Sequence, residues 1–174
     1  MYFSLKKRNR GFSLVETIAY TALLALLITV ITYVITLLFR ANSIVKSTRD
    51  VENSAIAATD RMMREIRAAS SVDLPNSSFG VDEGILSLVI PSGSGTRTVR
   101  FYLENSKIMV DDNGVQTGPL TLSSTQVTSL RFYYLTSTTS QAVKFETVLI
   151  GPISDPGISE KLYGTAVLRG SYIQ

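Results

Sequence analysis

Cysteine and histidine are both absent from this chain of 174 residues. Without cysteine there is no disulfide and no thiol nucleophile, and without histidine the commonest general base is missing. The two absences together also remove most zinc sites. We therefore expect a protein that is not an enzyme and that uses no cofactor and no metal.

Glycine and proline are missing from the 63 residues between Phe12 and Leu74. Because these two residues most often interrupt or end helices, their absence predicts one long helix. A fully helical stretch of this length would measure about 95 Å at 1.5 Å per residue. The hydrocarbon core of a bilayer is only about 30 Å thick, so the helix is expected to continue beyond a membrane.

The first half of this stretch is apolar enough to cross a membrane. Between Phe12 and Arg40 the only charged residue is Glu16. About 20 residues suffice to span a bilayer, whereas the apolar core of a secretory signal runs to about 15. The exit from Leu38 to Asn42 shows no small-x-small cleavage pattern. We therefore expect a transmembrane helix over residues 12–39.

Basic residues precede the apolar segment and set its expected orientation. They are Lys6, Lys7, Arg8 and Arg10. Positively charged flanks stay on the cytoplasmic side, which places the chain beyond the helix outside the cytoplasm. The chain is therefore expected in the cytoplasmic (inner) membrane as a single-pass protein with its amino terminus inside.

Glu16 is the feature that a simple anchor does not explain. A lone carboxylate within a membrane span carries a large free-energy cost, which a neighbouring cation would lower. Cleavage of the chain between Gly11 and Phe12 would create such a cation, because the new terminus at Phe12 is a free amine.

The residues from Lys6 to Glu16, Lys-Lys-Arg-Asn-Arg-Gly-Phe-Ser-Leu-Val-Glu, resemble the processing site of type IV prepilins and pseudopilins. In that family a basic leader ends in glycine, and prepilin peptidase cuts after the glycine and N-methylates the new terminus. The resemblance implies a leader peptide over residues 1–11, cleavage after Gly11 and methylation of Phe12. It also implies that Glu16 acts in filament register and assembly.

The same resemblance implies the partners of the chain. They are prepilin peptidase, other pilins or pseudopilins, an inner-membrane assembly platform and membrane lipid. After processing, the protein is expected in a cell-surface or periplasmic filament.

The formal charge of +3 comes largely from the leader. Without the four basic leader residues, 13 basic and 14 acidic residues remain, which is a formal charge of −1. The overall charge therefore gives little support to a nucleic-acid partner.

The second half of the helical stretch, residues 40–74, is amphipathic. Apolar or small residues recur at steps of three and four, which predicts one buried face. Asp60 and Arg64 on the opposite face are spaced for a favourable ion pair. The helix is expected to end between Ser70 and Pro75, because proline disfavours helix in the residue before it. The residues of the expected buried face are Ile44, Thr48, Val51, Ala55, Ala58, Met62, Ile66 and Ala69.

Threonine and alanine gather on one arc of the membrane half. Small residues there would let neighbouring helices approach closely. Threonine hydroxyls also bond to the carbonyl four residues earlier in their own helix, whatever surrounds them. Both interpretations stay open. The residues are Thr17, Thr21, Ala25, Thr29, Thr32 and Thr36.

Beyond Pro75 the pattern changes from helix to strand. Asp112-Asn113-Gly114 predicts a tight hairpin turn, and residues 91–95, 137–140 and 151–157 are expected as loops. Five to seven antiparallel strands after one long helix make an α+β plan. We expect a pilin-like fold, with the amphipathic helix packed on an antiparallel β-sheet domain over residues 75–174. Apolar residues indicate strands at Leu86–Ile90, Val99–Leu103, Lys107–Val110, Leu130–Tyr134, Val143–Ile150 and Leu162–Arg169.

Within the family, the chain is most similar to the PilW/GspJ type of minor pilins and pseudopilins. Met63–Arg67 resembles their acidic-and-basic segment near the helix end, and Thr165–Gly170 resembles their closing strand. Major pilins often carry a proline near the position of Tyr33 and a carboxyl-terminal disulfide, and both are absent here. The departures favour a low-copy subunit. The outermost pseudopilin often lacks the acid found here at Glu16, so another subunit is expected distal to this one.

Other candidate sites favour structural roles. Ser92–Thr96 lacks the lysine of a phosphate-binding loop and predicts a flexible loop. Asp111–Gly114 is too compact for a calcium loop of the helix-loop-helix type. Asp155 lies in a loop of a kind that binds calcium in some pseudopilins, but a single acid is little support for such a site.

Arginines cluster near the expected helix end, at Arg61, Arg64 and Arg67. Asp60 and Glu65 are interleaved with them, which predicts a solvated face rather than a contact with DNA.

These observations favour a minor pilin or pseudopilin, a non-enzymatic structural subunit of a type IV pilus, type II secretion or competence filament. One alternative is a single-pass membrane-anchored extracytoplasmic binding domain that never polymerises, which a failure of cleavage at Gly11 would favour. Another is a DNA-contacting component of an uptake pilus, which a basic stripe on the folded β domain would support.

Overall fold

The computed structural model describes residues 13–152 and 157–171. It begins with one helix, α1, which runs from Leu14 to Ala68. The long helix predicted from the absence of glycine and proline is therefore confirmed. The chain forms two compact units, one ending at Ser43 and the other beginning at Ile44.

Helix α1 ends at Ala68, two residues before the range from Ser70 to Pro75 in which its end was predicted. The backbone N–H of Ser70 donates to the carbonyl of Val89 at 2.9 Å, and the next two residues form strand β1 (Ser71–Val72). Because these backbone groups bond to the sheet, the helix ends before Pro75. Residues up to 74 were expected to be helical, but those after Ala68 lead into β1 and the 3-10 helix η1 (Leu74–Asn76).

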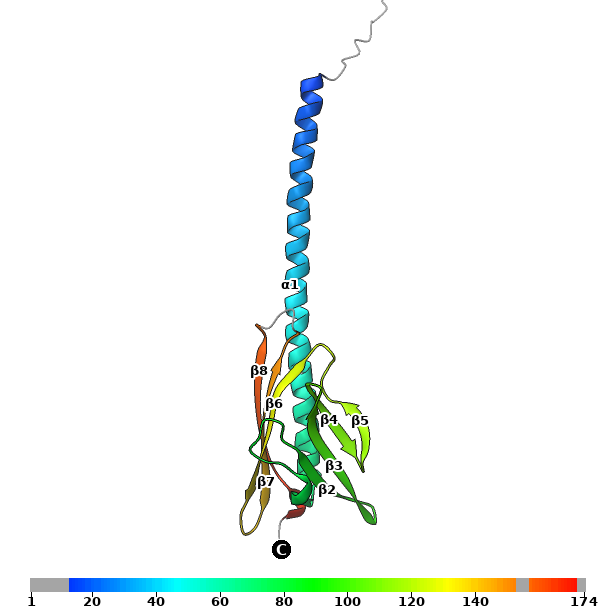
Figure 1. Ribbon diagram of the computed structural model, residues 1–174, viewed down its shortest axis with the longest axis vertical. Helices are drawn as coiled ribbons and strands as arrows, with labels where there is room; N and C mark the ends of the chain where they lie inside the picture. The colour runs from blue at the N-terminus through cyan, green and yellow to red at the C-terminus, as the bar shows by residue number, and fades with distance from the viewer. Residues whose placement is uncertain (1–12, 153–156, 172–174) are drawn as a thin grey trace, which may run out of the picture. The chain divides into compact units, whose positions relative to one another are not determined.

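The second unit contains a five-stranded antiparallel sheet whose strands follow one another in chain order (Figure 1). After β1 come β2 (Leu86–Ser92), β3 (Gly95–Glu104), β4 (Lys107–Asp112) and β5 (Val115–Pro119). At the turn between β4 and β5, Asn113 and Gly114 have φ angles of 51° and 79°. Positive φ at both central residues is what a type I′ hairpin turn requires, so the predicted hairpin is confirmed.

Three further strands form a separate antiparallel sheet, β6 (Gln126–Thr136), β7 (Gln141–Ile150) and β8 (Ser159–Val167). A short 3-10 helix, η2 (Arg169–Ser171), follows them. The sequence predicts strands at all three places, but the last prediction is wrong at Leu168, which follows β8, and at Arg169, which begins η2. It also does not predict the division into two sheets. That division arises because β6 bonds to a loop rather than to a strand of the first sheet. The Leu130 N–H donates to the Asp82 carbonyl at 2.7 Å, and the Gly84 N–H donates to the Leu130 carbonyl at 2.8 Å.

The described residues form eight strands, more than the five to seven expected, and one predicted loop is shorter than expected. The strand β1 has only two residues, and β5 pairs only with β4 and shows no apolar alternation, so neither carries a periodic signal. The predicted loop over residues 91–95 is wrong at Pro91 and Ser92, which belong to β2, and at Gly95, which begins β3.

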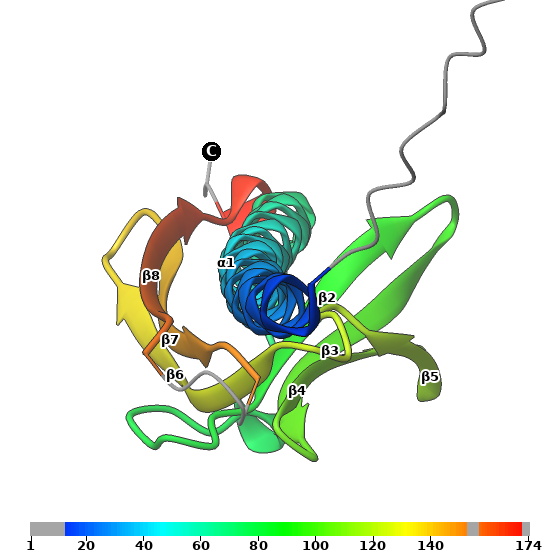
Figure 2. The same ribbon diagram turned by 90° about the horizontal axis from the view of Figure 1, so that it is seen from above.

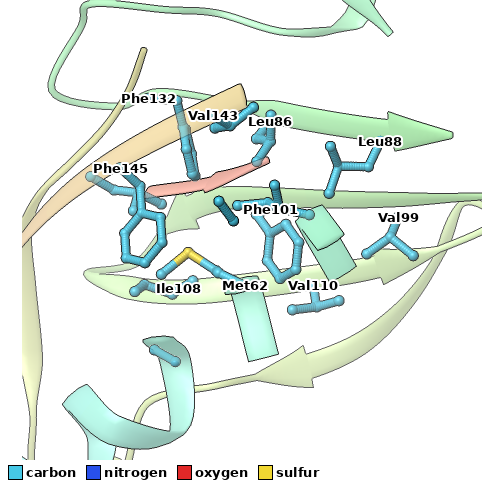
Figure 3. Close-up of a cluster of buried hydrophobic side chains, with 14 of the residues drawn as sticks. Met62, Leu86, Leu88, Val99, Phe101, Ile108, Val110, Phe132, Val143 and Phe145 are labelled. Carbon is cyan, nitrogen blue, oxygen red and sulfur yellow. The ribbon is translucent and has the colours of Figure 1, made fainter. Parts of the chain in front are cut away.

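The hydrophobic core of the second unit lies between the two sheets and the outer part of α1 (Figure 2). Met62 of α1 lies among side chains from both sheets in the close-up of Figure 3. Phe101 from β3, Phe132 from β6 and Phe145 from β7 are fully buried in this cluster. One helix covered by two antiparallel sheets confirms the α+β class.

The buried face of α1 differs from the predicted face at its beginning. From Val51 to Ala69, all six predicted residues are buried. Ile44 is 50% exposed and Thr48 is only half-buried, so the prediction was wrong for these two. Ser47 is the first residue of α1 that is buried, so Ile44 lies before the part of the helix that the β domain covers.

A buried serine joins α1 to the connection between β5 and β6. The Leu122 N–H donates to the Ser54 hydroxyl oxygen at 3.1 Å, and the Ser54 hydroxyl donates to Thr125 Oγ1 at 3.1 Å. The Lys107 ammonium donates to the carbonyls of Leu122, Ser123 and Thr125 in the same connection. Burial lowers the pKa of Lys107. These bonds satisfy the backbone of an irregular segment that packs against the helix.

Candidate functional site

Helix α1 places Glu16 in its first turn. The Glu16 side chain is exposed, and the Tyr20 hydroxyl donates to Glu16 Oε1 at 3.4 Å. This hydrogen bond is long, so it stabilises the negative charge of the carboxylate only weakly. Among residues 13–152 and 157–171, no lysine or arginine forms an ion pair with Glu16. The carboxylate is therefore available to a cation from outside the described chain.

The apolar surface around Glu16 belongs to the one described helix that is long and apolar enough to cross a membrane, judged by length and composition. None of its most apolar 18-residue window is buried within the chain. Leu14, Tyr33 and Phe39, for example, are each more than 70% exposed. Exposed apolar surface of this extent marks a contact with membrane or with another protein.

The threonines in the apolar first half of α1 bond to their own helix. The hydroxyls of Thr29, Thr32 and Thr36 each donate to the carbonyl four residues earlier, at 2.8 to 2.9 Å. Thr17 and Thr21 make equivalent bonds to carbonyls three or four residues earlier. The prediction that these hydroxyls bond to carbonyls of their own helix is therefore confirmed. The arc consequently presents methyl groups with satisfied hydroxyls, a surface that suits an apolar neighbour.

The other residues of the predicted processing site lie outside the described residues. These are the leader residues Lys6, Lys7, Arg8 and Arg10 and the cleavage pair Gly11 and Phe12. Asp155, the weak calcium candidate, also lies outside them. Glu16 is the member of the predicted site that the structure describes.

The remaining candidates in the second unit have structural explanations. Within Ser92–Thr96, only two residues separate β2 from β3, and Gly93 there has a φ of 57°. Asp111–Gly114 forms the end of β4 and the hairpin turn. In the described part of the chain, no three acidic side chains gather in a group that could hold a metal ion.

The acidic-and-basic segment Met63–Arg67 contains a buried ionic contact that sequence reasoning missed. Glu65 is only 3% exposed, although it was assigned to a solvated face. Its carboxylate pairs with Arg61 at 2.9 Å and with Arg97 of β3 at 2.5 Å. Arg97 also pairs with Asp112 at 2.8 Å. The sequence does contain one indication of this burial, because Glu65 lies between Met62 and Ile66 at the margin of the apolar stripe.

The expected pair of Asp60 with Arg64 is not among the ion pairs of the described chain, where Arg61 and Glu65 form the intrahelical pair instead. Arg64 and Arg67 are exposed. Burial of Glu65 therefore separates the three clustered arginines into one that is paired and two that face solvent.

Comparisons of the chain with models of protein families, with curated proteins and with solved structures find no match.

Proposed function

We propose that this chain is a minor pilin or pseudopilin, made as a prepilin and assembled without enzymatic activity into a type IV pilus, type II secretion or competence filament. The observation that carries this proposal is the position of Glu16. It is the one acid near the start of a helix whose apolar surface is exposed along its whole membrane half.

The exposed apolar surface supports a protein that passes from lipid into a helical assembly. In the membrane, lipid covers the residues from Leu14 to Phe39. In a filament, the same residues contact the helices of other subunits, and the satisfied threonines allow close packing against them. The β domain then lies outside the cytoplasm, where its strands contact neighbouring subunits.

Glu16 supports polymerisation over simple anchoring. A carboxylate within lipid costs free energy that an anchor gains nothing from. In an assembly, the amine of a neighbouring subunit that begins at Phe12 neutralises it and sets the axial register. Prepilin peptidase creates this amine by cutting after Gly11, and an inner-membrane assembly platform brings the subunits together.

A low-copy role is supported by the helix itself. Major pilins of the resembled family often carry a proline near the position of Tyr33. Here Tyr33 lies within an α-helix that has no proline along its length. Such a helix does not have the unwinding point that the abundant subunits use.

The same helix would serve the alternative function, a single-pass membrane-anchored binding domain that never polymerises. Only processing at Gly11 and pairing at Glu16 distinguish the two functions. Processing is therefore the test.

Co-expression of the full chain with a prepilin peptidase is expected to remove eleven residues and to methylate Phe12, both visible by intact mass. Gly11→Val is expected to block the cut, because a β-branched side chain crowds the scissile bond. Asn9→Val is the matched control and should be cut normally. A product cut near Ala41 would identify a secretory signal instead, and an uncut wild-type chain would favour the anchored binding domain.

A further inference from the structure

Three exposed arginines meet where the carboxyl-terminal turn lies beside the end of α1. Arg64 and Arg67 come from the last turns of α1, and Arg169 comes from η2. All three line one surface depression of about 450 Å³. Asp60, Met63 and Ala68 complete its lining.

Close packing of the chain end holds Arg169 in this place. Leu168 is fully buried, and its N–H donates to the Gln141 carbonyl at 2.9 Å. The Gly170 N–H donates to the Ala69 carbonyl at 3.2 Å. A Cβ atom at Gly170 would lie only 2.5 Å from the Cα of Ser70. Only glycine therefore lets the turn lie this close to the helix end, and this contact brings Arg169 to Arg64 and Arg67.

The three arginines differ from the paired arginines beside them. Arg61 and Arg97 share the carboxylate of Glu65. For Arg64, Arg67 and Arg169, the described residues provide no ion pair.

The depression consequently has an excess of positive charge, since Asp60 is the single acid in its lining. The dipole of α1 favours a cation near Ala68. The dipole does not account for three arginines at this place, because like charges around one depression repel one another. A bound anion removes this repulsion. The guanidinium fork matches the oxygens of a phosphate group, to which it donates two parallel hydrogen bonds.

We propose that Arg64, Arg67 and Arg169 form a binding site for a phosphate group. A free phosphate and a phosphodiester of nucleic acid present the same oxyanion chemistry. Because the net charge without the leader residues is −1, binding rests on this local cluster and not on the charge of the whole chain.

The test uses the full chain in an uncharged detergent, titrated with inorganic phosphate and, separately, with a short fluorescent DNA duplex. The combined variant Arg64→Gln, Arg67→Gln and Arg169→Gln should bind whichever probe the wild type binds at least about tenfold more weakly, because charge-assisted bidentate bonds are lost. The control variant removes the same charge elsewhere, through Lys46→Gln, Arg49→Gln and Arg100→Gln, and should bind like the wild type. Equal weakening by both variants would show non-specific attraction and overturn the site.

Gly170→Ala tests the geometry without changing any charge. The added methyl group displaces the turn from Ser70, and binding should weaken while Arg64 and Arg67 remain in place. Thermal unfolding followed by circular dichroism checks that this variant is folded. Arg169→Lys provides a second test of probe binding, because it keeps the charge but loses the guanidinium fork.

The two probes distinguish the source of the phosphate. A slope of log K against log salt that is steeper by about 2 to 3 for the wild type than for the combined variant corresponds to three phosphate contacts and assigns the site to nucleic acid. Binding of inorganic phosphate with equal or greater affinity assigns it to small phosphate compounds. If the wild type binds neither probe, the proposal is wrong.

Discussion

The carboxylate of Glu65 ties the outer part of α1 to strand β3 through Arg97, whose guanidinium nitrogen lies 2.5 Å from Glu65 Oε2. The Glu65 side chain is 5% exposed and the Arg97 side chain is 26% exposed. Arg61 and Asp112 extend this pair into a chain of four charges. A carboxylate held so far from water is tolerated only while its cations remain beside it.

Glu65→Gln is therefore expected to lower the free energy of unfolding by about 1–3 kcal/mol, because two charge-assisted bonds are weakened next to a buried group. Urea unfolding of the full chain in detergent, followed by circular dichroism, measures the change. Asp60→Asn is the control, since Asp60 is exposed on the same helix and has no ion pair in the described chain. If both variants unfold at the wild-type urea concentration, Glu65 contributes nothing to holding α1 against β3.

Asp82 is expected to make stability depend on pH in the acid range. The Arg131 guanidinium donates to Asp82 Oδ1 at 2.6 Å, and the Ser129 hydroxyl donates to the same oxygen at 2.9 Å. These bonds, that of Arg131 first, lower the pKa of Asp82 below its ordinary value of 3.8. A lowered folded-state pKa stabilises the protein at pH values above the unfolded-state pKa, and this contribution is lost as the pH falls through the folded-state pKa.

Asp82→Asn should therefore flatten the decrease in unfolding midpoint below about pH 4. Urea midpoints measured across a pH series test this, with Glu83→Gln as a control at an exposed neighbouring acid. A pH profile for Asp82→Asn that coincides with the wild-type profile would contradict the proposed coupling.

Gly164 is required by the ring that lies over it. A Cβ atom at Gly164 would lie 2.2 Å from the Phe145 ring, which is fully buried. Gly164→Ala is expected to lower the free energy of unfolding by about 1–3 kcal/mol through overpacking. Gly95→Ala is the matched control, because nothing lies within 4 Å of a Cβ atom there. Equal unfolding midpoints for the two variants would show that β7 and β8 can separate to accept the methyl group.

The elements that the sequence predicts are those whose signal is local. A helix without glycine or proline and strands such as β3 and β6, with their alternating apolar residues, follow from the period of the side chains alone. The same holds for the Asn113-Gly114 turn, because these two residues tolerate positive φ. Glu16 stands out for a similar reason, as the single charge in an apolar run.

What the sequence does not predict depends on contacts between distant residues. The division into two sheets follows from bonds of Leu130 with residues 82–84, which lie more than forty positions away. The burial of Glu65 depends on Arg97, and the place of Arg169 depends on the contact of Gly170 with Ala69. No periodic pattern records such pairs, since each is settled only when the whole domain packs.

Glu16→Ala is expected to leave processing and membrane insertion intact but to reduce incorporation into filaments at least about tenfold, the factor that ~1.4 kcal/mol of pairing free energy provides. In the proposed filament, the variant lacks the carboxylate that is expected to pair with the amine of a neighbouring Phe12. Immunoblots of sheared filaments and of membranes measure the two fractions. Glu52→Ala, which removes an exposed acid from the outer half of the same helix, is the control. Unchanged incorporation of Glu16→Ala would leave Glu16 as a feature of leader recognition only.

The chain is expected to make up a few per cent or less of the main subunit in filaments. A helix without proline near Tyr33 and a chain without cysteine both depart from the abundant pilins of the resembled family. Glu16 argues against the outermost position, because an acid there needs a distal neighbour whose amine can pair with it. Quantitative mass spectrometry of sheared filaments measures the ratio. If this chain formed most of the filament mass, it would be the major subunit, and Tyr33 would lie in a helix that does not need an unwinding point in order to polymerise.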